Sequence, residues 1–161
     1  MKNTLFLILF MAGIFTMASA KDLQWKKYNA GVVEAKKTGK KVLVDVYTDW
    51  CKWCKKMDEV TYKDGKVKAY LEQNFVVIKL DAEGTENVSY QGRTMAAPQF
   101  AKEMQIDGYP ATLFMKSSGE AITVLPGYSE PAMFLNVLSY IKEEQYSKKN
   151  FEQYLKEKGV Q

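Results

Sequence analysis

The stretch VLVDVYTDWCKWC, residues 42–54, contains the features from which the fold of this chain can be predicted. Its first six residues are rich in β-branched side chains and almost continuously apolar, which is typical of a strand buried on both faces. Asp45 interrupts this apolar run and therefore needs an explanation. A short turn then leads to two cysteines, Cys51 and Cys54, which are three positions apart.

We expect the two cysteines to lie in the first turn of a helix that runs from Cys51 to about Thr61. Residues at i and i+3 share a helix face, so a bond between the two sulfurs can form and break with little backbone movement. The unpaired N–H groups and the dipole at the helix start favour an anionic sulfur at Cys51, and Lys52 acts in the same direction. Cys54 is expected to be the more buried thiol. The predicted chemistry is attack by Cys51 on a disulfide, followed by release through Cys54.

Other interpretations of the cysteine pair stay open but find less in the sequence. Half a zinc site would need two further ligands, and the chain has no other cysteine and no histidine, which leaves only carboxylates. Covalent haem attachment needs a histidine after the second cysteine, where this chain has Lys55. A structural disulfide is the main alternative, although it would close almost no loop and would restrict the unfolded chain very little.

The composition is that of one globular domain with a short appendage. The 161 residues are 47% hydrophobic and 26% charged, and a chain of this length can bury roughly two thirds of its unfolded surface without disulfide staples. The absence of histidine excludes histidine-dependent hydrolysis and His-ligated metal sites within this chain. The net charge is +4 with lysines and acids interspersed, which indicates solvated faces and no nucleic-acid track.

Residues 1–20 have the three-part pattern of a secretory signal peptide. Lys2 is followed by an apolar run at 5–15, and Ala-Ser-Ala at 18–20 supplies the small residues for cleavage after Ala20. A retained membrane anchor is the alternative, but a spanning helix needs roughly 20 apolar residues and this run is shorter. We therefore expect an exported mature chain without a membrane span, in the periplasm or another extracytoplasmic space where disulfides persist.

The mature chain is predicted to have an α/β architecture, with a central mixed β-sheet flanked by helices on both faces. Besides the helix after Cys51, helices are expected at residues 29–37, 66–73, 96–104, 130–144 and 148–158. Strands are expected at residues 42–47, 75–81, 111–115 and 121–125, and residues 83–95 are predicted to form an irregular loop. We divide the mature chain into a domain at 21–145 and a C-terminal helical extension at 146–161, which either docks on the domain or mediates dimerisation.

Two local predictions concern individual helices. Asn29 can cap the start of the first helix of the mature chain, and Gly39 lies just past its end. In the helix after Cys51, the side chains of Trp53, Met57 and Val60 are expected to form one apolar stripe.

The WCKWC motif at residues 50–54, which follows an apolar strand, resembles the active-site region of the thioredoxin superfamily. The resemblance covers about residues 25–141 and implies the thioredoxin fold, with the helix at the C-terminus as an addition. It also implies thiol-disulfide oxidoreductase activity on protein thiols and disulfides. The redox-active group would be the Cys51–Cys54 disulfide itself, with no other cofactor and no metal.

The resemblance assigns a function to the acid that interrupts the first strand. Asp45 lies six residues before Cys51, where thioredoxins have a buried acid, and it would relay the proton of Cys54 as that thiol becomes a nucleophile. Lys79 matches the lysine that neighbours this acid. The alternatives are an Asp45 exposed at a strand end and a Lys79 that is a solvated strand-end lysine.

The sequence GYPAT at residues 108–112 resembles the cis-proline loop of the same superfamily. The resemblance implies that Pro110 is cis and faces the cysteines, and that the backbone of Tyr109 pairs with the substrate chain. Trp50, Trp53 and Tyr109 would border the substrate-binding groove. An ordinary trans proline in a turn is the alternative, since cis X–Pro bonds are a minority.

The Lys-Trp pair between the cysteines differs from ordinary thioredoxin. The surrounding sequence is more similar to the thioredoxin-like branch that includes the C-terminal periplasmic domain of the membrane reductase DsbD. Because the buried acid belongs to the reducing branch, the resemblance favours a reductase or thiol-exchange protein with a membrane electron donor of the DsbD or CcdA kind. Alternatives are a disulfide oxidase or isomerase, and a non-catalytic module that uses the groove to bind partners.

Overall fold

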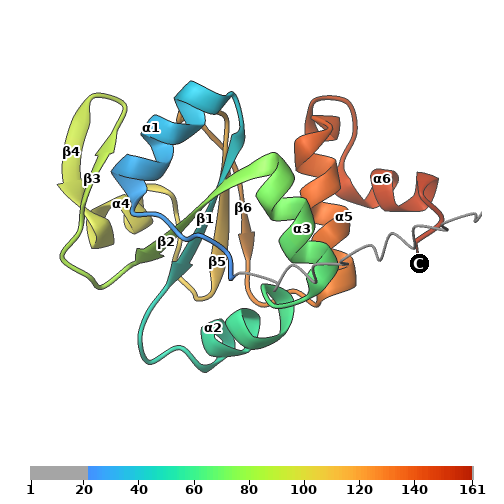
Figure 1. Ribbon diagram of the computed structural model, residues 1–161, viewed down its shortest axis with the longest axis horizontal. Coiled ribbons are helices and arrows are strands. Elements are labelled where there is room, and N and C mark those ends of the chain that lie inside the picture. Colours follow the sequence, from blue (N-terminus) through green and yellow to red (C-terminus); the bar gives the residue numbers. More distant parts are fainter. Residues whose placement is uncertain (1–21, 161) are drawn as a thin grey trace, which may run out of the picture.

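The computed structural model describes residues 22–160 and confirms the predicted α/β architecture with a central mixed sheet (Figure 1). The strands are β1 (Lys41–Tyr47), β2 (Phe75–Asp81), β5 (Ala111–Met115) and β6 (Ala121–Pro126), in the spatial order β2-β1-β5-β6. Strand β1 runs parallel to β2 and antiparallel to β5, and β6 is antiparallel to β5. The cysteine-bearing segment therefore follows directly on a central strand of the sheet.

Helices cover both faces of the sheet, and a further helix lies at one end (Figure 1). They are α1 (Tyr28–Thr38), α2 (Lys52–Lys56), α3 (Gly65–Asn74), α4 (Ala97–Glu103), α5 (Pro131–Lys142) and α6 (Phe151–Glu157), with a π-helical turn at Met57–Thr61 and a 3₁₀ turn at Gln145–Ser147. One face of the sheet packs against α1 and α4, and the other packs against α3 and α5. Figure 1 shows α2 at one end of the sheet and α6 beyond α5.

The sequence of β1 explains its central place. Val42, Val44 and Val46 point into the core on the α1 side, while Leu43 points into the core on the α3–α5 side. All four side chains are fully buried. Because successive side chains of a strand alternate between faces, a strand that is apolar at almost every position can be buried on both, and Asp45, the polar position within the run, is buried as well.

The prediction that Asn29 caps the first helix is wrong. Helix α1 begins at Tyr28, whose backbone N–H donates to the Glu86 carboxylate over 2.8 Å. The Asn29 side chain instead donates to the carbonyl of Asn87 and accepts from the N–H of Ser89. A residue 58 positions away supplies the cap, which local spacing does not reveal.

The prediction of an irregular loop at residues 83–95 is also wrong. This segment contains strand β3 (Asn87–Tyr90), and strand β4 (Arg93–Ala96) begins within it, so that the two form an antiparallel hairpin. Gln91 and Gly92 in the two-residue turn both have positive φ, 48° and 77°, as the favoured hairpin turns require. Val88, Tyr90 and Met95 bury one face of the hairpin in the α1–α4 core, a period-2 pattern that was present in the sequence but short.

The helix after Cys51 has the expected length but a different apolar face. Only Met57 of the predicted stripe is buried, whereas Trp53 is 55% and Val60 is 39% exposed. The helix changes to π-helical geometry at Met57, and the wider turn moves later side chains away from α-helical positions. Trp53 lies in the first turn, where α2 extends past the end of the sheet (Figure 1).

The C-terminal extension forms the expected helix, and this helix docks on the domain. In α6, capped by Asn150, the rings of Phe151 and Tyr154 each lie 5.3 Å from the ring of Tyr140 on α5. The Tyr140 hydroxyl donates to the carbonyl of Lys149 over 2.6 Å. Tyr154 is 3% exposed and belongs to the same core as α3 and α5.

The proposed signal peptide at residues 1–20 lies outside the described residues. Among the helices of residues 22–160, the structure contains none with the length and apolar character to cross a membrane.

Candidate functional site

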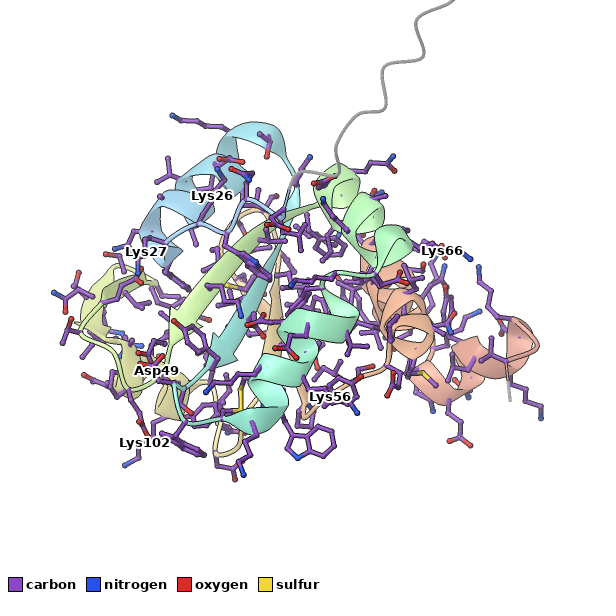
Figure 2. All side chains as sticks on the ribbon, turned by 60° about the horizontal axis from the view of Figure 1, so that its bottom comes forward. Lys26, Lys27, Asp49, Lys56, Lys66 and Lys102 are labelled. Atoms are coloured by element: carbon purple, nitrogen blue, oxygen red, sulfur yellow. A yellow bond between two sulfur atoms is a disulfide. The ribbon has the colours of Figure 1, made fainter. Side chains whose placement is uncertain are left out.

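The two cysteines form a disulfide at the start of α2, with an S–S distance of 2.09 Å. Cys51 is the N-cap of α2, and its sulfur accepts a hydrogen bond from the backbone N–H of Cys54 over 3.0 Å. Figure 2 shows the disulfide on the part of the molecule that presents Lys56 and Asp49. The placement of the pair at the first helical turn is as predicted.

The two cysteines do not differ in exposure as expected. Cys51 is 4% and Cys54 is 3% exposed, so Cys54 is not distinctly the more buried residue. In this oxidised form the disulfide and the hydrogen bond from the Cys54 N–H hold the Cys51 sulfur against the first turn.

Exposed aromatic side chains surround the disulfide. Trp50, which precedes Cys51, is 64% exposed; its ring lies edge-on to Tyr109 at 6.1 Å, and its indole N–H donates to Glu83 over 3.0 Å. Trp53, between the cysteines, lies 5.4 Å from the ring of Tyr128. Large exposed apolar side chains of this kind are typical of surfaces that bind other molecules.

The structure brings Asp45 together with Lys79, as the resemblance implied. Asp45 is 1% exposed and lies in register with Lys79 on β2 and with Thr112 on β5. The Lys79 ammonium lies 2.7 Å from one carboxylate oxygen of Asp45, and the Tyr62 hydroxyl donates to the other over 3.1 Å. The alternative that Asp45 is an exposed strand-end acid is therefore wrong.

Lys79 is a paired lysine, so the alternative of a solvated strand-end residue is wrong as well. Its ammonium also pairs with Asp58 over 2.5 Å. The rings of Trp25, Tyr47 and Tyr62 lie 4.9 to 5.8 Å from the same nitrogen. Such a site keeps an ammonium charged, because two carboxylates and three aromatic faces replace water around it.

The local environment changes the pKa values of Asp45, Lys79 and Tyr62 for different reasons. Burial raises the pKa of Asp45 above its ordinary 3.8, and the Lys79 ammonium offsets only part of this effect. Burial by itself lowers the pKa of Lys79, but Asp45 and Asp58 outweigh it and raise that pKa above 10.5. Burial and then the Asp45 charge raise the pKa of Tyr62 well above 10. Burial therefore makes the Asp45 carboxylate a stronger proton acceptor than an exposed aspartate.

The sequence did not identify three residues of this buried group. Asp58 lies four positions after Cys54, a spacing that predicts the same side of the helix but does not reveal that Asp58 pairs with Lys79. Tyr62 lies just past the π-helical turn, and Thr112 is fully buried with a hydroxyl that has no hydrogen-bond partner within residues 22–160. The only early signal for Thr112 was its place in the GYPAT sequence.

Pro110 follows a cis peptide bond, as the resemblance implied, and the trans alternative is wrong. Its carbonyl accepts a hydrogen bond from the N–H of Gly127 over 2.8 Å, which fixes the loop to the end of β6. Tyr109, which precedes it, lies beside Trp50. The loop is thus held next to the aromatic side chains around the disulfide.

The other predicted residue, Lys52, is exposed in the first turn of α2. No carboxylate lies within ion-pair distance of it in the part of the chain that the structure describes. The same part contains no group of three or more cysteine, aspartate or glutamate side chains arranged to hold a metal ion.

Comparisons with known proteins agree with this geometry. Residues 28–142 match the family model of the thioredoxin-like domain. The thiol:disulfide interchange protein DsbD of Actinobacillus pleuropneumoniae is 33% identical over 105 residues, 64% of this chain, but the chain covers only 16% of that protein's length.

Two solved structures show the similarity in three dimensions. A thioredoxin-fold protein of Helicobacter pylori has a TM-score of 0.67 at 17% identity and covers 86% of this chain and 91% of its own. The C-terminal domain of DsbD from Neisseria meningitidis, in its reduced form, has a TM-score of 0.53 at 23% identity, with 69% and 90% covered. At these identities the two structures support the fold alone.

Proposed function

This chain belongs to the thioredoxin-like domain family, and from this premise we propose that it is a thiol-disulfide oxidoreductase that reduces protein disulfides outside the cytosol. One observation supports the proposal most directly. The Cys51 sulfur accepts a backbone N–H at the start of α2, in the position where a reduced sulfur would be stabilised as an anion.

The first half of the reaction uses Cys51 in the reduced protein. Its thiolate attacks one sulfur of a partner disulfide, so the partner S–S bond breaks and a Cys51–partner mixed disulfide forms. The other partner sulfur leaves as a thiolate and takes up a proton. The hydrogen bond from the Cys54 N–H lowers the free energy of the attacking anion before the reaction, and the exposed rings of Trp50 and Trp53 hold the partner chain.

The second half uses Cys54 and the buried acid. Cys54 loses its proton to the Asp45 carboxylate and attacks the Cys51 sulfur of the mixed disulfide. The partner leaves with its second thiol, and the protein keeps the two-electron oxidation as the Cys51–Cys54 disulfide. The raised pKa of Asp45 makes it a better proton acceptor than an exposed aspartate, while Lys79 stabilises the ionised form that must accept the proton.

The same acid supports the reductive direction that we propose, because a base that activates Cys54 accelerates release of a reduced partner. The equilibrium direction itself depends on the redox potential of the couple. We propose that a membrane dithiol protein of the DsbD or CcdA kind returns two electrons to Cys51 and Cys54 after each turnover, and that no further cofactor takes part. The signal-peptide pattern at residues 1–20 supports a periplasmic or other extracytoplasmic location.

The test is reduction of insulin disulfides by the mature protein, with dithiothreitol as electron supply. The wild-type protein should accelerate insulin precipitation, and the Cys51→Ser variant should not exceed the dithiothreitol background. Equal turnover by that variant would overturn the mechanism.

The redox potential of the disulfide tests the direction separately. Equilibration with glutathione should place the Cys51–Cys54 couple near thioredoxin, at about −270 mV, and far from the oxidant DsbA at about −120 mV. A value at the oxidising end would assign the protein to disulfide formation or isomerisation.

A further inference from the structure

Lys56 has an unusual position on the surface beside the disulfide. Its ammonium nitrogen lies 5.1 Å from the ring centroid of Trp53 and 4.9 Å from that of Tyr128. The two rings are 5.4 Å apart and inclined by 35°, so the charge rests against both aromatic faces. Cation–π contacts of this kind restrict a side chain that is otherwise among the most mobile.

The charge of Lys56 is not neutralised by a carboxylate. In residues 22–160 no acidic oxygen lies within 4.0 Å of its nitrogen, and the same holds for Lys52 and Lys55 of the same helix. Asp58, two positions further along, is paired with Lys79. Helix α2 therefore presents a set of exposed positive charges at the disulfide, one of them held in a fixed place.

Trp53 connects this charge to the reaction. It lies between the two cysteines in sequence, and its ring is 55% exposed. A polypeptide that brings its own sulfur to Cys51 must pass next to that ring.

We propose that Lys56 is a specificity-determining residue that selects partner proteins with aspartate or glutamate close to the exchanging cysteine. The proposal rests on the proposed function, because it concerns the partner of the same disulfide. A partner carboxylate pairs with the Lys56 ammonium, while an apolar side chain of the partner covers Trp53. Since the two rings already restrain the ammonium, less side-chain freedom is lost when the ion pair forms.

Two peptides test this preference. Each contains one intramolecular disulfide, and they differ only in the two residues beside one cysteine, which are glutamate in the first and glutamine in the second. The rate constant for reduction by the dithiol form of the mature protein is measured for both. The wild type should prefer the glutamate peptide by about threefold at low ionic strength, and the preference should disappear in 1 M salt.

The variants isolate Lys56. Lys56→Gln should remove the preference, and Lys56→Glu should reverse it to about threefold in favour of the glutamine peptide. Lys66→Glu is the matched control, since it makes the same charge change at an exposed lysine of α3, away from Lys56 (Figure 2). It should keep the wild-type ratio. Using the ratio of two peptides cancels any change in the intrinsic reactivity of Cys51.

Two results would overturn the proposal. One is equal reduction of both peptides by the wild type, and the other is a loss of preference in Lys66→Glu as large as in Lys56→Glu. If the wild type reduces neither peptide, the proposed function fails and the specificity fails with it. If it reduces both at the same rate, only the specificity fails.

Discussion

Aromatic side chains and lysines occur together both at the start of α2 and between α5 and α6, but the aromatic rings are exposed at the first location and buried at the second. At the start of α2, Trp50 and Trp53 are more than half exposed. Between α5 and α6, Tyr140 and Tyr154 are buried, and each lies about 5 Å from a further ring of the same group. Figure 1 shows these places at separate positions, with α2 below the sheet and α6 beyond α5.

The ion pairing of the lysines differs as well. Lys149, just before α6, pairs with Glu157. Lys52 and Lys56 on α2 have no ion-pair partner among the described residues. The aromatic residues near α6 are therefore part of the folded core, whereas those near α2 lie on the surface beside the disulfide.

The largest expected effect comes from removing the second sulfur at α2. In Cys54→Ser, Cys51 can still attack a partner disulfide but nothing resolves the product, so turnover should fall by at least about a thousandfold. A Cys51–partner mixed disulfide should accumulate and be seen by mass spectrometry as one adduct per protein. Release of partner at the wild-type rate would show that Cys54 is not the resolving thiol.

Asp45→Asn should slow turnover by about a hundredfold at neutral pH, because the acceptor for the Cys54 proton is lost. The same substitution should make the protein more stable relative to wild type as the pH rises. Burial raises the folded-state pKa of Asp45, so its protonated form stabilises the fold fully below the unfolded value near 4, and this stability is lost as the pH rises through the raised pKa.

The asparagine variant does not titrate at this position. Its free energy of unfolding relative to wild type should therefore increase between pH 4 and pH 8, as measured by urea denaturation. A difference that stays constant over this range would contradict the role of burial at Asp45. Asp49→Asn, at an exposed position in the turn before Cys51, is the control and should show no such trend.

Truncation of a buried ring on α6 should lower stability but leave the rate of disulfide reduction nearly unchanged. Tyr154→Ala removes a 3%-exposed ring and should lower the free energy of unfolding by about 3 kcal/mol. The rate of insulin reduction per folded molecule should stay within about twofold of wild type. Lys158→Ala, which removes the cation above that ring together with its aliphatic stem, should change stability by less than about 1 kcal/mol. A strong loss of activity in folded Tyr154→Ala would mean that the two places are coupled.

The smallest effect is expected for one exposed ring at α2. Trp53→Ala should raise KM for a protein disulfide by about fivefold and leave kcat nearly unchanged, since the ring contacts the partner but not the reacting sulfurs. Val33→Ala is a control at a 51%-exposed apolar position on α1 and should leave both constants unchanged. Stability should change little in either variant, in contrast to Tyr154→Ala.

The strands of the main sheet could be predicted because runs of apolar residues in the sequence indicate burial. An almost continuously apolar run such as β1, which Asp45 interrupts, is stable between two layers of helices. The hairpin β3–β4 was not predicted, because each strand has only four residues and its buried face is set by packing on α1 and α4. The cap of α1 was assigned to the wrong residue for a similar reason, since Glu86, just before the hairpin, contacts it from 58 positions away in the chain.

The residues of the candidate site could be identified before the structure: two cysteines at helical spacing after a buried strand, an acid inside that strand, and a proline loop later in the chain. The cysteine pair followed from residue type and local spacing, whereas the acid and the proline loop were assigned through the resemblance to the thioredoxin superfamily. The same resemblance placed Lys79 beside Asp45, but Thr112 and Tyr62 were found only in the tertiary structure. Strand register places Thr112 beside the acid, and packing after the π-helical turn brings the Tyr62 hydroxyl to its carboxylate. Burial, which raises the pKa of that acid, likewise arises from packing of distant segments and cannot be derived from neighbours in the chain.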